Sequence, residues 1–365
     1  MQSSEDIDDI ESSSIDSADA LCEMLGISTN AINCFQESSE EGNRASNASN
    51  FQDGDNADSS PVLTDDEICD IVSSENLAQI YKDESICLLP RELSVPQNLM
   101  RRLTTELVYG ETRYPSDRSY EKISFIPRGG GGVGGCGGTE NNIQERRELT
   151  RFENFVNGHQ GWQDLCNGHL AKCISAIVGE EMVLFKEKLN LKPPGGSGFA
   201  PHLDSPSLRI SFGDDGPSTF VTVMVAIDDM TTKNGCLKVC KGPWNECNHV
   251  ETIKPQDDGN PDAGGRAGAI EDEVAEQQLF EPITCKGGDI AAFNGFAPHR
   301  SSSNTSPFPR RAVFLTYNAA REGNYHDRYY DKMKELRDDW LKKMKSMRYA
   351  DHEAEIEALN SIPRT

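Results

Sequence analysis

The feature that most constrains the fold is a set of three metal-binding residue types whose members lie far apart in the chain. His202 and Asp204 are separated by one residue, and His299 follows far downstream. Two imidazoles and one carboxylate form a facial triad, which holds Fe(II) on one face and leaves the opposite face open. Residues i and i+2 of a β-strand point to one side, so the spacing predicts both first ligands on one strand. The third ligand must then come from a distant strand folded back beside the first, as in a barrel or sandwich.

An arginine downstream strengthens the metal interpretation. Taken alone, the His-x-Asp segment fits an exposed surface loop equally well, and a lone histidine such as His299 is usually structural. Arg310, however, opens a predicted apolar strand, and a guanidinium facing into a barrel can clamp a carboxylate through a bidentate pair. A 2-oxo acid would chelate iron through its keto-acid end and present its other carboxylate to Arg310. The neighbouring Arg311 should face the other side of the sheet as a solvated charge.

The second half of the chain consists of short apolar runs divided by Gly- and Pro-rich turns. Many short strands with such turns favour a mainly β domain, a jelly roll or barrel. Strands are predicted at Met182–Leu189, Leu208–Phe212, Thr219–Ile227, Gly235–Val239, Asp289–Phe293 and Ala312–Tyr317, with a further short one at Ile86–Leu89.

Helices are predicted to flank this β-rich region. Thr64 and Glu67 have the spacing of a capping box at a helix start, and Gly179 is placed to end another helix. His169 lies beside an apolar helical stripe and is predicted to be a core histidine rather than a ligand. Helices are predicted at 95–108, at 160–178 and, as an amphipathic packing element, near 325–347.

Composition divides the chain into a tail and one large domain. Residues 1–60 hold fourteen Asp and Glu against Arg44 alone, with few aromatics, which predicts a disordered acidic tail. The domain is predicted at 61–350, with its catalytic β-core at about 182–318. The glycine-rich segment 129–138 lacks the Lys-Ser/Thr of a phosphate-binding loop and is interpreted as a flexible insertion. A polar stretch at 254–281 is interpreted as a second insertion, a long surface loop.

The charge and the cysteines limit the partners and the compartment. The net charge of −24 argues against nucleic acid or an anionic membrane as partner, and leaves the oligomeric state open. The eleven cysteines form no CxxC cluster, and neither a signal peptide nor a membrane-spanning apolar run is visible. We therefore expect reduced thiols and a cytoplasmic protein. A structural zinc on Cys236, Cys240 and Cys247 is disfavoured by their spacing.

Several short motifs, in a fixed order, resemble the phytanoyl-CoA dioxygenase type of Fe(II)/2-oxoglutarate oxygenases. The resemblance extends over roughly residues 62–345. The matching stretches are Leu189–Pro194, Pro201–Asp204, Asn234–Leu237, Lys286–Asp289 and His299–Asn304, followed by Arg310.

This resemblance implies a double-stranded β-helix, cupin-like in architecture, with flanking helices. It implies that His202, Asp204 and His299 hold the iron, and that Arg310 binds the distal carboxylate of 2-oxoglutarate. Ser301 and Asn190 are implied as further 2-oxoglutarate contacts. The implied cofactors are Fe(II), 2-oxoglutarate and O2, and the implied reaction hydroxylates a C–H bond with release of succinate and CO2.

Within the family, two runs are most similar to the branch that contains 2-aminoethylphosphonate dioxygenase. They are Lys188–Gly196 and Tyr317–Gly323. One departure lies near the predicted pocket, since Gly242-Pro243-Trp244 stands where relatives carry a Gly-Ser/Thr-His segment. The acidic tail and the glycine-rich insertion have no counterpart in the family.

The sequence leaves the substrate open. The leading hypothesis is a small polar molecule such as an aminophosphonate, which would need cations beyond Arg310. Lys186, Lys188 and Arg209 are the candidates, and surface charge is the alternative for each. Two other functions were weighed: an oxygenase acting on lipid or acyl-CoA chains, and a non-catalytic cupin-like binding protein.

Overall fold

The computed structural model describes residues 63–110, 117–125, 144–210, 212, 215–253, 268–336, 338, 339 and 342. Two compact units are distinguished, and residues 120–149 belong to the smaller one. Strand β2 (Asp117–Phe125) pairs with β3 (Gln144–Glu153), and residues 120–125 and 144–149 of these strands belong to the smaller unit. The predicted tail at 1–60 and the predicted insertion at 129–138 lie outside the described residues.

A large antiparallel sheet forms the centre of the main unit. Its strands, in spatial order, are β1 (Ile86–Leu88), β9 (Ile290–Asn294), β6 (Val221–Ala226), β11 (Arg310–Ala319) and β4 (Met182–Lys192). At the β4 edge, Arg151–Glu153 of β3 continue the sheet by pairing with Lys188–Asn190. Every residue of β6 is buried, and its run of valines suits a strand that is covered on both faces.

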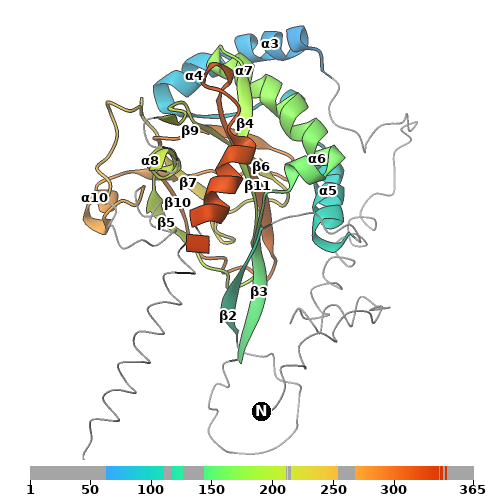
Figure 1. Cartoon of the computed structure of the whole chain (residues 1–365), viewed down its shortest axis with the longest axis vertical. Coiled ribbons are helices and arrows are strands. Elements are labelled where there is room, and N and C mark those ends of the chain that lie inside the picture. The colour runs from blue at the N-terminus through green and yellow to red at the C-terminus, as the bar shows by residue number, and fades with distance from the viewer. Residues whose placement is uncertain are drawn as a thin grey trace, which may run out of the picture. The chain divides into compact units, whose positions relative to one another are not determined.

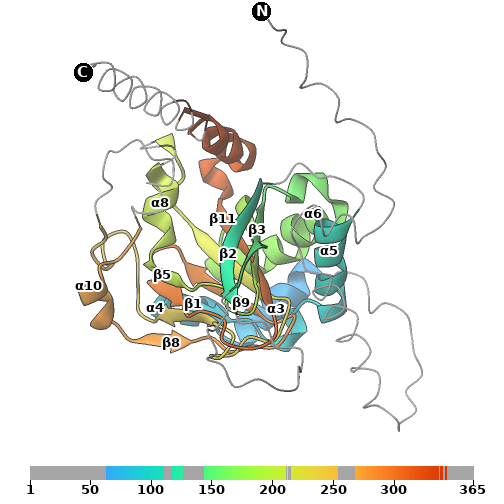
Figure 2. The same ribbon diagram turned by 90° about the horizontal axis from the view of Figure 1, so that it is seen from below.

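A smaller antiparallel sheet stands on the other side of the large one from helices α5 and α6, and it carries part of the site (Figures 1 and 2). Its strands, in spatial order, are β5 (Phe199–His202), β10 (His299–Ser301), β7 (Leu237–Cys240) and β8 (Phe280–Pro282). Two antiparallel sheets, with α5 and α6 on the side of the large sheet, form the cupin-like double-stranded β-helix that the family resemblance implies.

The helices largely follow the sequence prediction. Thr64 caps α3 through a complete capping box with Glu67, and Gly179 ends α7 in the left-handed conformation at φ 83°. The predicted helix at 160–178 is continuous but contains a π-helical segment. The helices are α3 (Asp65–Ser74), α4 (Leu77–Glu84), α5 (Gln97–Tyr109), α6 (Gln160–Asp164), π-helical η3 (Leu165–Leu170), α7 (Ala171–Val178), α8 (Asp204–Ile210) and α10 (Asp272–Glu276). Single 3-10 turns lie at η1 (Arg91–Leu93), η2 (Val156–Gly158) and η5 (Ala320–Glu322), and a further helix covers 326–336.

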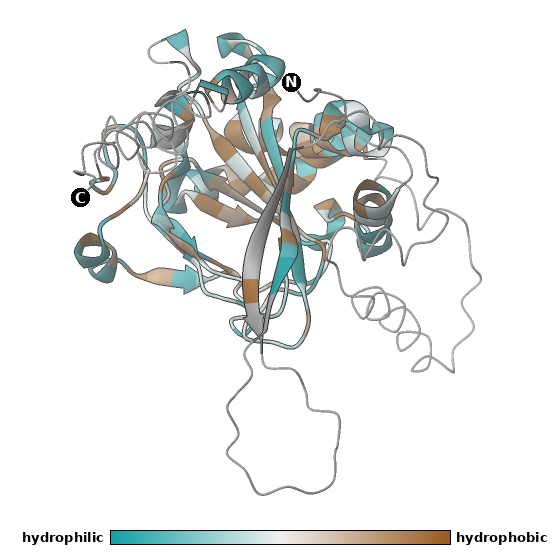
Figure 3. Cartoon of the chain, turned by 60° about the horizontal axis from the view of Figure 1, so that its bottom comes forward, coloured by the Kyte–Doolittle hydropathy of each residue, from teal (hydrophilic) through white to brown (hydrophobic). Residues whose placement is uncertain are grey.

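The apolar core lies between the large sheet and the layers on its two sides. Hydrophobic residues concentrate on the central strands, whereas the outward faces of the helices are hydrophilic (Figure 3). Tyr317 of β11 is fully buried and donates a hydrogen bond from its hydroxyl to the backbone oxygen of Cys166, which ties sheet to helix. No helix among the described residues is long and apolar enough to cross a membrane.

Two predicted elements were wrong. The apolar run Leu208–Phe212 was predicted as a strand, but most of it lies in α8, where Leu208 packs with Phe185 and Phe220. An apolar run of this length fits a buried helical turn as well as a strand. The stretch 254–281 was interpreted as one long loop, yet its described part contains α10 and the start of β8, and Ala275 of α10 is buried.

Candidate active site

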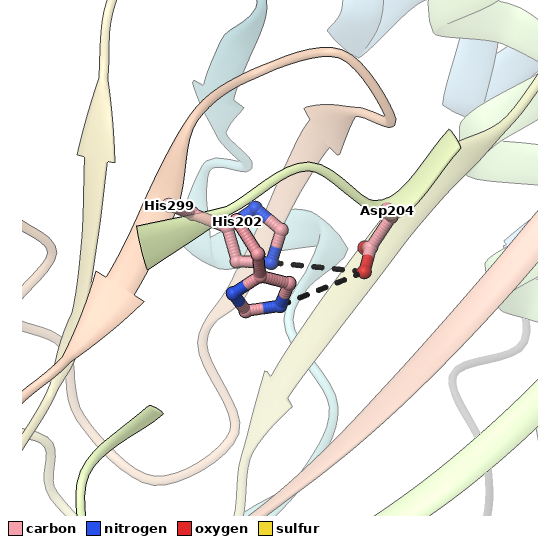
Figure 4. A group of neighbouring side chains, drawn as sticks. All are labelled: His202, Asp204 and His299. Atoms are coloured by element: carbon pink, nitrogen blue, oxygen red, sulfur yellow. Dashed lines mark ion pairs between the residues drawn. The ribbon is translucent and has the colours of Figure 1, made fainter. Parts of the chain in front are cut away.

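Strand pairing in the small sheet brings the two predicted histidine ligands together. His299 of β10 is the direct register partner of His202 of β5, and their ring centroids are 4.1 Å apart. Asp204 does not share a strand with His202, because β5 ends there and Asp204 is the first residue of α8. The strand geometry predicted for the His-x-Asp pair was therefore wrong. The chain turns at Leu203 instead, and the turn aims the carboxylate at both rings (Figure 4).

The donor atoms of the three side chains face one another. Nε2 of His202 lies 3.9 Å and Nε2 of His299 lies 3.7 Å from Oδ1 of Asp204. All three ligand atoms lie within 4.8 Å of one another, and this is the metal-binding cluster found among the described residues. The fold therefore brings the three residues of the predicted triad together.

Backbone carbonyl groups fix the orientation of both imidazole rings. Nδ1 of His202 donates to the oxygen of Ala200 at 2.7 Å, and Nδ1 of His299 donates to the oxygen of Ala297 at 3.0 Å. A carbonyl oxygen only accepts, so each Nδ1 carries a proton, and each Nε2 faces Asp204. Burial, followed by the neighbouring His299, lowers the pKa of His202 to about 3, so its ring is neutral. His202 thus has the form that a metal ligand requires, and the bond to Ala297 orients the ring of His299 in the same way.

The carboxylate of Asp204 is held in its ionised form. Burial works to raise the pKa of Asp204, but the two histidines, Lys188 and the Thr222 hydroxyl together lower it to about 2. Thr222 donates from Oγ1 to Oδ2 at 2.8 Å, which turns Oδ1 toward the imidazoles. Two imidazoles with an anionic carboxylate are the donor set that suits divalent iron, so these residues fit the ion.

Arg310 is buried in the same pocket with only part of its hydrogen-bonding capacity used. It is 2% exposed, and Nη2 donates to the backbone oxygen of Gly235 at 2.7 Å. Nε and Nη1 have no hydrogen-bond partner among the described residues. Gly235 has φ +73°, and a Cβ there would lie 2.2 Å from the oxygen of Ser302, so only glycine allows this close approach. Burial lowers the pKa of Arg310 to about 10, which still leaves it cationic at neutral pH.

Ser301 and Asn190, the other two predicted 2-oxoglutarate contacts, also line this pocket. Oγ of Ser301 accepts from Nζ of Lys192 at 2.9 Å and from the backbone N–H of Phe199 at 3.2 Å. With its oxygen engaged, the hydroxyl hydrogen of Ser301 remains to donate to a ligand. Oδ1 of Asn190 is buried and has no partner among the described residues.

Of the three side chains proposed to bind a substrate anion, two line the pocket and one does not. Lys186 and Lys188 line the pocket, and burial, followed by the charges of Lys186 and Arg151, lowers the pKa of Lys188 to about 8. Arg209 does not line the pocket. It lies on α8, not on a strand, and forms an ion pair with Glu246 at the surface.

Arg311 and His169 take structural positions. Arg311 was predicted as a solvated charge, but it is 7% exposed and its Nε and Nη2 donate to both carboxylate oxygens of Asp228. His169 is a core histidine as predicted, with Nε2 bonded to the backbone oxygen of Leu93 at 2.8 Å.

Sequence reasoning missed several residues that build the pocket. Lys192, which orients Ser301, stands in period-two alternation with the pocket-facing lysines of β4, and that pattern is the signal that could have identified it. Nothing in the sequence singles out the other missed pocket residues, which are Phe199, Leu208, Thr222, Leu237, Phe314 and Thr316.

A double-stranded β-helix with this donor set is typical of non-haem metal proteins. Comparison of the sequence with protein families identifies a more specific similarity. Residues 137–312 match the family described as Phytanoyl-CoA dioxygenase (PhyH). This match confirms, for that part of the chain, the resemblance seen in the motifs.

Two similar proteins have phosphonate names. A 2-aminoethylphosphonate dioxygenase from uncultured bacterium HF130_AEPn_1 is 36% identical over 52% of this chain and 66% of its own length. A methylphosphonate hydroxylase from Gimesia maris is 33% identical over 49% of this chain and 62% of its own length. The chain therefore spans less than two thirds of these curated relatives. Among solved structures, EctD from S. alaskensis with 2-oxoglutarate and 5-hydroxyectoine has a TM-score of 0.46 at 18% identity, over 76% of this chain and 86% of that one.

Proposed function

We propose that this protein is an Fe(II)/2-oxoglutarate-dependent dioxygenase that hydroxylates a C–H bond of a small polar substrate. One observation carries the proposal: His202, Asp204 and His299 converge on a pocket that also contains a buried arginine with two unused donors. A metal site alone would fit many functions. The second, cationic feature in the same pocket is what a 2-oxo dicarboxylate requires.

The chain contributes ligands, orientation and a dry environment. His202, Asp204 and His299 would hold Fe(II), which with 2-oxoglutarate and O2 supplies oxidative decarboxylation and C–H hydroxylation, releasing succinate and CO2. Arg310 would bind the distal carboxylate of 2-oxoglutarate through its unused Nε and Nη1 donors. The hydroxyl of Ser301 donates to the same end of that molecule.

Apolar side chains in the pocket limit the access of water. Phe199, Leu237 and Phe314 line it beside the polar groups. Exclusion of water strengthens the pairing of Arg310 with a carboxylate, because the screening of charges is weaker in a site of low dielectric constant.

We propose a small phosphonate as the substrate class. The two relatives with phosphonate names support this, as do the cationic side chains that face the pocket. The net charge of the chain supports a small-molecule partner rather than nucleic acid.

We also propose a reducing, cytoplasmic compartment. The cysteines of the described residues are all free thiols, which supports a location where disulfides are rare. Fractionation of cells that express the tagged chain tests this, and recovery in a secreted fraction would contradict it.

The direct test is anaerobic titration of metal-free protein with Fe(II) and 2-oxoglutarate, followed by the visible charge-transfer band of the chelate. The band should form in the wild type, disappear in His202→Ala and need at least about tenfold more 2-oxoglutarate in Arg310→Gln. Arg321→Gln is the matched control, because Arg321 pairs with Glu180 at the surface and should behave as wild type.

Turnover completes the test. Fe(II)-loaded protein should release succinate and CO2 from 2-oxoglutarate in the presence of O2 and a phosphonate. Absence of the band in folded wild-type protein would end the proposal and leave a non-catalytic binding protein as the better description.

A further inference from the structure

One face of β4 presents two lysines to the pocket. Lys186 is 9% exposed, and neither its amine nor that of Lys188 makes a hydrogen bond or ion pair with a described residue. Nζ of Lys186 does lie 5.0 Å from the centre of the Tyr329 ring, which stabilises one cation partly but offers no counter-charge.

Two amines side by side in the pocket, of which Lys186 is buried and Lys188 partly buried, are unfavourable for the protein alone. Burial disfavours an ammonium group that lacks a partner, and the like charge of its neighbour adds to this. Lysines at i and i+2 of one strand face the same side, so neither can turn away from the other. The charges of Asp204 and Glu153 offset this for Lys188 only in part, so such an arrangement is expected where a ligand supplies further negative charge.

The lysines lie at the opposite end of the pocket from the proposed 2-oxoglutarate arginine. On the paired strands, Arg310 of β11 is level with Lys192, whereas Phe314 is level with Lys188 and Thr316 with Lys186. Four residues of strand separate the levels of Lys192 and Lys188, which is about 13 Å at 3.3 Å per residue. A 2-oxoglutarate molecule held by Arg310 therefore leaves the two lysines to a second ligand.

A charge balance indicates how negative that second ligand is. Lys186, Lys188 and Arg310 are the cations of the pocket lining, and Asp204 is the one carboxylate among its described residues. With Fe(II) and dianionic 2-oxoglutarate bound, the pocket retains an excess of two positive charges. A monoanion would neutralise half of this excess, and a dianion would neutralise all of it.

We propose that Lys186 and Lys188 form a specificity subsite for a dianionic tetrahedral group on the substrate, as carried by phosphonates and phosphate monoesters. This rests on the proposed function, and it assigns the residues that recognise the substrate. The anion lies against the two amines, beside Asp204, and places the adjoining carbon near the metal site.

Calorimetric binding to metal-free protein tests the subsite without turnover. The probes share one ammonium group and differ in the tetrahedral group: 2-aminoethylphosphonate and O-phosphoethanolamine carry a dianionic group, and 2-aminoethanesulfonate carries a monoanionic one. Both dianions should bind at least about tenfold more tightly than the sulfonate, and Lys188→Met should weaken the dianions by about 10- to 100-fold while leaving the sulfonate nearly unchanged. Lys188→Arg should restore most of the affinity, and Lys186→Met should resemble Lys188→Met.

Lys332→Met is the matched control, since Lys332 pairs with Glu335 on the exposed face of helix 326–336. Wild-type affinity in Lys188→Met, or equal binding of sulfonate and phosphonate by the wild type, would overturn the subsite. Succinate release then separates the two dianions: formation with 2-aminoethylphosphonate alone identifies a phosphonate substrate, and formation with O-phosphoethanolamine alone identifies a phosphate ester.

The charge-transfer titration keeps this inference separate from the proposed function. Lys188→Met should form the Fe(II)/2-oxoglutarate band like the wild type, which also shows that the variant is folded. A normal band with unaltered dianion binding in the variant contradicts the subsite alone. A missing band in the wild type contradicts the oxygenase itself.

Discussion

Charged side chains on the two faces of strand β4 differ in how many hydrogen-bond partners they have. On the helix side, Glu187 is fully buried, and its carboxylate accepts from the backbone N–H groups of Phe155 and Val156. It also bonds with Nε2 of His326 at 2.7 Å and with the hydroxyl of Tyr330 at 3.0 Å. On this face each acceptor oxygen of the charge has two partners.

On the pocket side of the same strand, the polar groups lack partners. Lys186 and Lys188 make no hydrogen bond with the described residues, and Oδ1 of Asn190 is buried without one. A saturated polar network rigidifies a fold, whereas buried groups without partners are unfavourable until a ligand arrives. The charge of Glu187 therefore stabilises the fold, whereas the charges of Lys186 and Lys188 are available to bind a ligand.

Removing the saturated carboxylate should have the largest effect on stability. Glu187→Ala leaves two buried N–H groups and a histidine without their acceptor, and we expect a loss of about 3–5 kcal/mol in the free energy of unfolding. Urea denaturation measures this. Glu180→Ala is the matched control, because its pairing with Arg321 is exposed and should contribute less than about 1 kcal/mol. Equal losses in the two variants would contradict the distinction between the faces.

The partner of this carboxylate should make stability depend on pH. Burial favours the neutral ring of His326, but the hydrogen bond and charge of Glu187, with those of Asp327, outweigh it and raise the pKa of His326. A raised folded pKa gives stability that is complete below the unfolded pKa of about 6.5 and is lost as pH rises through the folded value. We expect the wild type to exceed His326→Gln by about 1–2 kcal/mol at pH 5.5, and the gap to shrink above pH 7. A gap that widens with pH would show that the ring is neutral in the folded protein.

The pocket face should show the opposite pH dependence, with a smaller effect. In metal-free protein we expect Lys188→Met to raise the free energy of unfolding by about 1 kcal/mol at pH 7, since it removes a partly buried ammonium that makes no ion pair with a described residue. The pKa of Lys188 is lowered to about 8 in the folded chain, against about 10.4 unfolded, so the unfolded state binds more protons between these values. The free energy of unfolding of the wild type should therefore rise relative to that of Lys188→Met from pH 8 to 10. Thermal melts of both proteins across this range measure the difference. Destabilisation by Lys188→Met at pH 7 would indicate that the amine has a structural partner.

The smallest effect is expected at Arg209, which the sequence placed among the substrate contacts. Its ion pair with Glu246 lies at the surface, so Arg209→Gln should change the free energy of unfolding by less than about 1 kcal/mol. Calorimetric affinity for 2-aminoethylphosphonate should change by less than about twofold. A loss of affinity comparable to that of Lys188→Met would show that Arg209 of α8 contacts the substrate.

Local patterns predicted much of the fold. The capping box at Thr64, the glycine that ends α7 and the strands at β6, β9 and β11 depend on nearby residues, so the sequence predicts them directly. The wrong elements were those whose local pattern is ambiguous. The run Leu208–Phe212 is apolar enough for a strand or a helix, and only its packing against Phe185 and Phe220 decides for α8.

The sequence by itself determined which residue types are available at the candidate site. The types of the ligand residues, their order and the turn residues between them can be read without knowing the fold. The sequence named His202, Asp204, His299 and Arg310 without any geometry. Only the tertiary structure decided that Asp204 reaches the imidazoles from a helix start rather than from a strand. It also decided which cations face the pocket, because the face of a side chain follows from strand register. Lys188 therefore faces the pocket, and Arg209, equally cationic in the sequence, faces solvent.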